Sequence, residues 1–190
     1  GNKGIYASTG LITIDGKGYL QMDGNKSYGI YVDKGGKVVL NGGVSIDAQK
    51  EGNQGIYIYG IGNVELHGSV DIFTGSDAAA NAININGKGS TAENKAQVNG
   101  TAQFNMLGNI KVSNGGSIDL EMTEGSFWQG AAGIDAGNGS TSSLSFGNNA
   151  VWKLTGNSEV TDLTLDGAWL DMTADGNAFS TLKLSLIHIS

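Results

Sequence analysis

A short phrase recurs along the first half of the chain, at Gly4-Ile5-Tyr6, Gly29-Ile30-Tyr31 and Gly55-Ile56-Tyr57, with the weaker Ala82-Ile83-Asn84 after them. The intervals between these phrases are 25, 26 and 27 residues. Repeats of this length are typical of solenoids, in which each unit buries its apolar side only against its neighbours. The repeat therefore predicts a stacked architecture rather than a single closed core.

A second phrase runs in step with the first and has the form apolar, any residue, glycine, three residues, apolar. It extends from Ile14 to Leu20, Leu40 to Ile46, Leu66 to Ile72 and Val98 to Phe104, at intervals of 26, 26 and 32 residues. The longer interval coincides with the polar insert 87–94, which predicts a surface loop. We expect the central glycines of the phrase to stack at one corner, where they permit a backbone bend; they are Gly16, Gly42, Gly68 and Gly100.

The apolar residues within these phrases alternate, as in Val38 and Leu40 or Val64 and Leu66, which is the period of strands with one buried face. No segment keeps a helical period, and the chain has 32 glycines but no proline, so tight corners are frequent and no ladder hydrogen bond is forbidden. About 25 residues without a helix make roughly three strands and three turns. The sequence predicts an all-β fold, a right-handed single-stranded parallel β-helix of roughly seven coils.

Charge divides the chain into two regions. Residues 1–110 carry eight lysines against nine acids, whereas residues 111–190 carry three against nine, so most of the net charge of −7 lies in the second region. We interpret 1–110 as regular coils and 111–183 as the C-terminal coils. The acidic balance argues against nucleic acid or an anionic membrane as a partner. We also expect no direct membrane insertion, because no apolar run approaches 18 residues.

The C-terminal region holds all three tryptophans, Trp128, Trp152 and Trp169. Large aromatic side chains near the end of a solenoid help to close its core. We expect the terminal core to contain Phe127, Trp128, Trp152, Leu154, Leu163, Leu165 and Trp169. Residues 184–190 break the pattern and are similar to the translation of a sequencing adapter, so we interpret them as foreign to the protein.

Four stretches of the C-terminal region resemble the end of classical, pertactin-like autotransporter passengers. They are Ser126-Phe127-Trp128-Gln129-Gly130, Ala150-Val151-Trp152-Lys153-Leu154-Thr155, Ser158-Glu159-Val160-Thr161-Asp162-Leu163 and Phe179-Ser180-Thr181-Leu182. The resemblance covers about residues 110–183 and is only architectural before them. It implies a β-helical passenger at the bacterial cell surface or secreted, whose last coils act as an autochaperone. It also implies a C-terminal translocator barrel as a partner, which lies outside this chain.

Few residues have side chains suited to catalysis or to binding a metal or cofactor. The chain has neither cysteine nor arginine, and we expect no catalytic residue, cofactor or metal site. His67 occupies the outward position of its phrase, equivalent to Asp15, Asn41 and Asn99, and we interpret it as a surface residue. Asp119 and Glu121 alternate with Ile118 and Leu120, which predicts a solvated outward pair. The glycine-rich stretches match neither the calcium-binding β-roll nor the EF-hand pattern.

The residues Tyr6, Tyr31 and Tyr57 hold the same place in successive repeats, and Tyr59 follows on the same face. If Ile30 points inward, Tyr31 points outward, so these rings would stack coil on coil. An aromatic ladder that stabilises the sheet is the favoured interpretation. An exposed contact stripe for a receptor or glycan is the alternative.

These observations leave three hypotheses open. The first is a passenger fragment that serves as a surface stalk in adhesion or autoaggregation, without enzymatic activity and without a cofactor. Its partners would be a host receptor, a glycan or other copies of itself. The second is a carbohydrate-active β-helix enzyme, which requires outward carboxylates of neighbouring coils to converge with a lysine in a groove. The third is a phage or fibre structural module.

Overall fold

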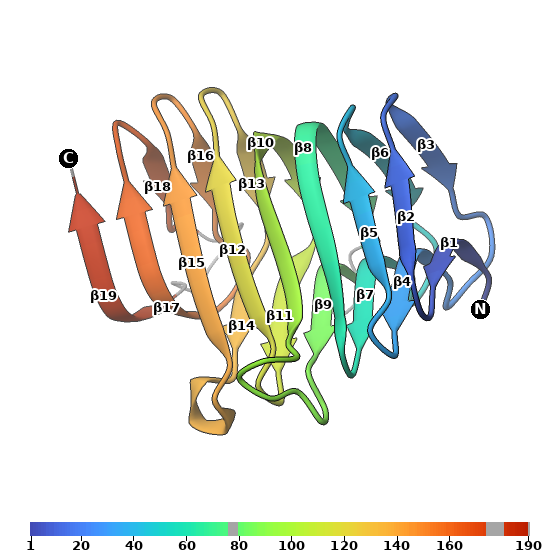
Figure 1. The fold of residues 1–190 in the computed structure, drawn as a ribbon. Coiled ribbons are helices and arrows are strands. Elements are labelled where there is room, and N and C mark those ends of the chain that lie inside the picture. The colour runs from blue at the N-terminus through green and yellow to red at the C-terminus, as the bar shows by residue number, and fades with distance from the viewer. Residues whose placement is uncertain (76–79, 174–180, 190) are drawn as a thin grey trace.

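The computed structural model describes residues 1–75, 80–173 and 181–189. In these ranges the chain winds into a β-solenoid of about 7 turns, about 26 residues apart, in which all strand pairs are parallel (Figure 1). The all-β, parallel β-helix that the repeat predicts is therefore confirmed, and its right-handed sense stays a prediction. Within the described ranges no helix is long and apolar enough to cross a membrane.

Each turn contributes strands to three faces. The first face contains β1 (Lys3–Ala7), β4 (Tyr28–Asp33), β7 (Gln54–Tyr59), β9 (Asn81–Asn86), β11 (Asn109–Ser113), β14 (Ala132–Ile134) and the start of β17 (Ser158–Leu165). The second contains β2 (Leu11–Ile14), β5 (Lys37–Leu40), the first half of β8 (Gly62–Thr74), the first half of β10 (Ala96–Leu107), β12 (Ser117–Met122), β15 (Thr141–Phe146), the rest of β17 and the second part of β19 (Leu182–Ile189), which begins on the first face. The third contains β3 (Gly18–Gln21), β6 (Val44–Ala48), the second halves of β8 and β10, β13 (Phe127–Gln129), β16 (Val151–Lys153) and β18 (Trp169–Asp171). A single 3₁₀ turn, η1 (Ala136–Asn138), precedes β15 within the described ranges.

The core consists of columns of like residues that run along the solenoid axis. One column on the first face contains Ile30, Ile56 and Ile83, each paired with the same position of the next coil and fully buried. On the second face Val38 pairs with Val64, and Val64 with Val98. Burying one such side chain contributes about 1.5–3 kcal/mol, so the stacked columns supply most of the driving force for folding.

The register across the polar insert differs from the predicted one. Gly100 pairs with Leu66 and not with Gly68, whose partner is Ala102. A methyl group on Gly100 would lie 2.8 Å from Cβ of Leu66 and 3.3 Å from Cζ of Phe104. Gly100 therefore occupies an inward column and leaves room for the buried Phe104 ring, which the repeat phrase alone could not indicate.

The other three glycines of the phrase form the predicted corner stack. A methyl group on Gly42 would lie 2.5 Å from the backbone carbon of Gly16, and one on Gly68 would lie 2.9 Å from the backbone of Gly42. Gly16 belongs to the first coil of the described ranges, and a methyl group there meets nothing within 4 Å. The stack requires glycine wherever a preceding coil lies against it.

The two regions of different charge share one ladder, because β11 spans the boundary at residue 110. At the C-terminal end β19 pairs with β17 from Leu182 opposite Ser158 to Ile189 opposite Leu165. It includes residues 184–189, whose side chains are mostly exposed. Their foreign origin stays a prediction.

The corner stack gives a matched test of the coil spacing. We expect Gly42→Ala to lower the free energy of unfolding by roughly 2–3 kcal/mol, because its methyl group meets backbone that cannot move without shifting a coil. Gly16→Ala should change it by less than about 1 kcal/mol, since the same corner is open there. Urea denaturation of both variants measures the difference, and equal effects would contradict the stacked corner.

Candidate functional site

The tyrosines of the repeat form a ladder on the outside of the first face. Tyr6 pairs with Tyr31 and Tyr31 with Tyr57 in the strand register. The ring centroids are 5.5 and 5.3 Å apart, with edge-to-face orientation in both pairs. This is the preferred arrangement for aromatic pairs and contributes about 0.5–1.5 kcal/mol per pair beyond burial. The rings therefore stabilise one another along the solenoid axis. Their role as a contact surface for a partner stays a prediction.

Two further rings extend the ladder sideways. Tyr59 lies opposite Asp33, with its centroid 6.4 Å from that of Tyr57. Tyr28, which the repeat did not single out, stacks on Tyr57 at 5.2 Å and meets Tyr31 edge-on at 5.1 Å. Strict alternation would place Tyr28 and Ile30 on one side of the strand. Gly29 and Ile30 are consecutive in the sequence and both are buried, which breaks that alternation. The Tyr28 side chain therefore lies on the outer face of the sheet.

Charged groups fix the first rings of the ladder. The Lys3 ammonium lies 3.9 Å from the centroid of Tyr6 and 4.0 Å from that of Tyr31, which are cation–π contacts. The Tyr6 hydroxyl donates a hydrogen bond to the Asp33 carboxylate at 3.2 Å. Burial, and next the negative charge of Asp33, raise the pKa of Tyr31 to about 12. The ladder is thus built around neutral phenols and one cation.

A shallow hollow of about 330 Å³ lies on the second face. Glu65 and His67 of β8 form one wall, Asp119 and Glu121 of β12 form the other, and β10 lies between them. In register, Glu65 faces Asp119 across Asn99, and His67 faces Glu121 across Thr101. His67 is therefore equivalent to Thr101 and not to Asn99, for the same reason that Gly100 is displaced. We refer to these residues as the acidic hollow.

Part of the acidic hollow is already paired. The Lys37 ammonium lies 2.6 Å from Glu65, and the Thr101 hydroxyl donates a hydrogen bond of 3.0 Å to Glu121. Carboxylates and an imidazole are side chains that can transfer a proton to or from a bound ligand. Within the described ranges no group of three or more acidic, histidine or cysteine side chains is arranged to hold a metal ion.

The C-terminal core contains a stack of three aromatic rings. Trp128 and Trp152 occupy successive coils with centroids 4.5 Å apart, and Phe146 lies 5.7 Å from Trp152. All three are fully buried. Each indole N–H donates to a glycine carbonyl one coil away, Trp128 to Gly108 at 2.9 Å and Trp152 to Gly130 at 3.1 Å. The polar edge of each ring is thereby satisfied without water.

The structure buries five of the seven residues predicted for the terminal core and leaves two at its outer side. Leu154, Leu163 and Leu165 are buried together with the two inner tryptophans. Trp169 is 70% exposed and Phe127 is only partly buried, because both alternate with an inward neighbour and point away from the core. The inward neighbours are Trp128 and Leu170, which continue the column of Trp152.

Comparisons with known proteins give two relatives, both called YcgV. They are an uncharacterized protein of Escherichia coli O157:H7 and a probable autotransporter of Escherichia coli (strain K12). Each is 26% identical over 178 residues, or 91% of this chain, and the chain spans 30% of the first relative and 17% of the second. No family model and no solved structure matches. Nearly the whole chain is therefore similar to a probable autotransporter, which agrees with the resemblance in residues 110–183.

The raised pKa of Tyr31 predicts an alkaline limit to stability. The folded state favours the neutral phenol, so this contribution is complete below about pH 10 and is lost as the pH rises towards and through 12. Tyr31→Phe cannot ionise and should lose less stability over that interval. Urea midpoints measured on both proteins across it give the comparison, with Tyr19→Phe as an exposed control. Parallel losses in the wild type and Tyr31→Phe would contradict the assignment.

Proposed function

We propose that the chain is a segment of an autotransporter passenger, displayed at the bacterial cell surface or secreted. The observation that carries this is the coincidence of a parallel β-solenoid in the described ranges with sequence similarity to a probable autotransporter over 91% of the chain. A solenoid suits that role, because each coil contacts only its neighbours and can fold as it emerges. Its partner in export is a translocator domain elsewhere in the same protein.

The role proposed for this segment is a surface stalk that takes part in adhesion or autoaggregation. The support is its outer surface, where columns of tyrosine and of apolar side chains and a cluster of acidic side chains lie on separate faces. Such regular columns suit a host receptor, a glycan or another copy of the chain. The net charge of −7 argues against nucleic acid or an anionic membrane as a partner.

We further propose that the C-terminal coils act as an autochaperone. The buried stack of Trp128, Phe146 and Trp152 supports this, since it is the largest aromatic cluster of the described core. Replacing one buried tryptophan by alanine costs about 3–5 kcal/mol in a typical core. Coils held this tightly would be able to form first and offer a paired edge to the rest of the chain.

A carbohydrate-active enzyme is the second candidate function, and the acidic hollow is the observation that favours it. Carboxylates from two coils face one another there, and Lys37 lies at its edge. We nevertheless propose that the segment is not an enzyme, because Lys37 and Thr101 already engage two of the three carboxylates and no arginine exists to stabilise charge. Polysaccharide cleavage that is lost in Glu121→Gln would establish the enzyme instead.

Surface display tests the passenger proposal. Residues 1–183 are fused in front of the translocator domain of an autotransporter in place of its own last passenger coils. We expect protease added to intact cells to remove the chain. Trp152→Ala should lower the displayed amount several-fold by weakening the terminal core, whereas the exposed Trp169→Ala should not.

The same fusion without residues 1–183 is the control for the translocator. Retention of the wild-type chain inside cells would contradict the passenger proposal. Equal display of the two tryptophan variants would contradict the autochaperone role alone.

A further inference from the structure

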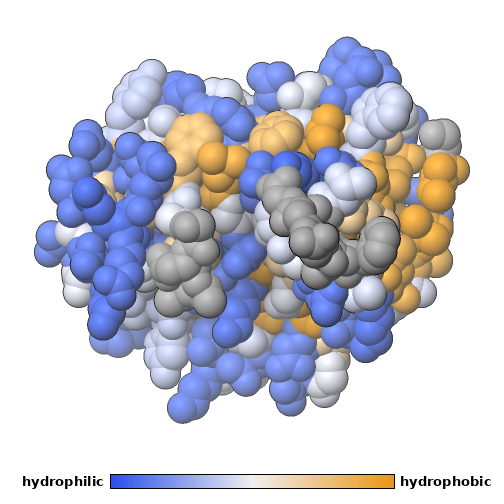
Figure 2. All heavy atoms as spheres, turned by 180° about the vertical axis from the view of Figure 1, so that it is seen from behind, coloured by the Kyte–Doolittle hydropathy of each residue, from blue (hydrophilic) through white to orange (hydrophobic). Residues whose placement is uncertain are grey.

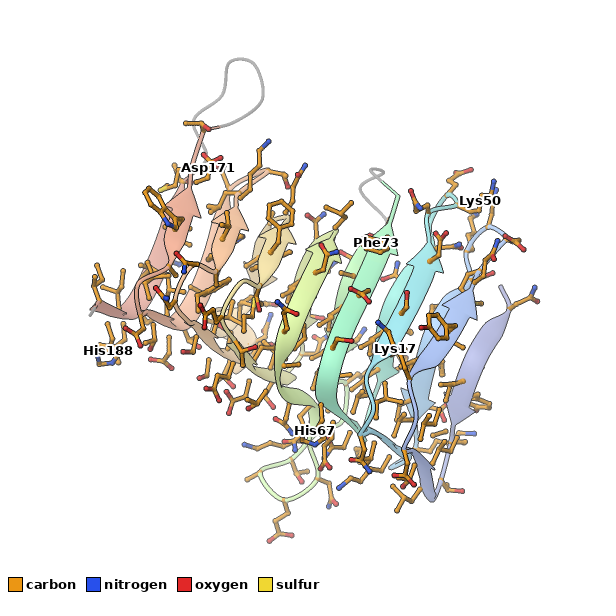
Figure 3. All side chains as sticks on the ribbon, turned by 90° about the horizontal axis from the view of Figure 1, so that it is seen from above. Lys17, Lys50, His67, Phe73, Asp171 and His188 are labelled. Carbon is orange, nitrogen blue, oxygen red and sulfur yellow. The ribbon has the colours of Figure 1, made fainter. Side chains whose placement is uncertain are left out.

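A row of outward apolar side chains crosses the third face. It occupies five successive coils and consists of Phe73, Leu107, Phe127, Val151 and Trp169, which we call the apolar row. Figure 2 shows apolar atoms on this face between a hydrophilic N-terminal part and the C-terminal end. In Figure 3, Phe73 and Asp171 lie towards one edge of the view, and His67 and His188 lie towards the other.

The strand register joins the members of the row. Phe73 pairs with Leu107, and Phe127, Val151 and Trp169 form one column. Leu107 lies two positions from Asn105, the partner of Phe127, so the two parts of the row meet diagonally. With coils about 4.8 Å apart, Phe127 and Trp169 are separated by about 10 Å. That distance matches the disaccharide repeat of an extended β-linked glycan.

The rings of Phe127 and Trp169 can contact a ligand more fully than the rings of the tyrosine ladder can. The tyrosines pack on one another at 5.1–5.5 Å and so cover part of their own faces. Val151 separates Phe127 from Trp169, and neither makes a ring contact within the described ranges. Trp169 keeps 70% of its surface exposed. An aromatic face carries partial negative charge and attracts the polarised C–H groups on the flat side of a sugar.

Hydrogen-bonding side chains border the row. Gln129, Lys153 and Asp171 form the adjacent outward column, in register with one another. Hydrogen bonds from Thr173, and to a smaller extent the charge of Lys153, hold the pKa of Asp171 below its ordinary value. One cation and one anion therefore stand side by side with an amide. This border offers hydrogen bonds to hydroxyl groups and carries no net charge to select an acidic chain.

A cleft of about 510 Å³ continues from the row. Leu107 of the row and Gln129 of its polar border line the cleft, and Asn109 and Thr155 add polar groups to its walls. The volume lies in the ordinary range of small-ligand sites, about 300–1,000 Å³. The row and the cleft together thus provide aromatic platforms, flanking hydrogen-bond donors and acceptors, and a recess.

The size of the row decides between a glycan and a protein partner. Five coils and one or two side-chain columns cover roughly 200 Å². A stable protein interface needs about 800 Å² from each partner, so the row is too narrow to hold a second copy of the chain. A linear oligosaccharide is itself narrow and lies along such a row.

We propose that the apolar row and its cleft bind an extended, uncharged, β-linked glycan chain. The inference deepens the proposed adhesion role and rests on it for its biological meaning, although the binding itself is a property of the isolated chain. Phe127 and Trp169 are the stacking platforms, and Gln129, Lys153 and Asp171 supply hydrogen bonds to the sugar hydroxyls.

Titration with cellohexaose and chitohexaose tests the proposal. We expect a saturable change in tryptophan fluorescence, which reports Trp169 because Trp128 and Trp152 are fully buried. By calorimetry, Trp169→Ala and Phe127→Ala should each weaken binding roughly fivefold or more, as expected for the loss of one aromatic platform. Maltohexaose, which is curved, and a hyaluronan hexasaccharide, which is acidic, should bind several-fold more weakly.

Tyr19→Ala is the matched control. Tyr19 is 75% exposed and occupies the column of Phe127, but Ser45, Asp71 and Asn105 separate the two. Its removal should leave binding unchanged, and unaltered melting curves establish that all variants are folded. Absence of saturable binding, or binding that Trp169→Ala and Phe127→Ala leave intact, would overturn the site. Self-association lost in Trp169→Ala would assign the row to a second copy and also overturn it.

A cell-attachment assay with the displayed chain separates the two proposals. If the wild-type chain binds no glycan and cells displaying Trp169→Ala still attach, the glycan site is contradicted and the adhesion role is supported. If the chain binds the glycan but does not attach cells, the glycan site is supported and the adhesion role is contradicted.

Discussion

Backbone hydrogen bonds join each coil to the next at matching positions, so that every side chain meets its counterpart about 4.8 Å away along the axis. Like residues therefore gather into columns, isoleucine on isoleucine in the core and tyrosine on tyrosine outside. The corner glycines follow from the same constraint, because a methyl group on Gly42 would strike the backbone of Gly16. The surface that a column offers to a ligand depends on how its side chains pack. The tyrosine rings pack on one another, whereas Val151 separates Phe127 from Trp169.

The repeat and the alternation of apolar residues were sufficient to predict the parallel solenoid, because period and alternation are properties of the sequence itself. Register across the insert was not predictable in this way. Gly100 follows the same phrase as Gly68, yet it lies inward above Leu66 so that Phe104 has room, and only three-dimensional packing distinguishes the two positions. Trp169 was misplaced because size suggested burial, whereas alternation with Leu170 directs it outward. Tyr28 was missed because Gly29 interrupts the alternation on which its side was judged.

The three faces of the solenoid carry different kinds of outward side chains. The first holds itself together through the tyrosine ladder, the second carries the acidic hollow, and the third presents the apolar row. The buried tryptophans connect the core to the third face, since Trp128 alternates with Phe127 on one strand and donates to Gly108 at the edge of the cleft. The side chains that close the terminal core thus fix the position of the proposed glycan platforms.

The register between β8 and β10 is the most direct test of this account, because both the core packing and the outer columns depend on it. The chain has no cysteine, so pairs can be introduced cleanly. Thr101 faces His67 across the ladder, whereas Asn99 lies two residues away from that position. A disulfide needs Cα atoms about 4.4–6.8 Å apart, so mild oxidation should link the pair His67→Cys with Thr101→Cys. The account predicts no such link for His67→Cys with Asn99→Cys, and preferential linking of that second pair would contradict it.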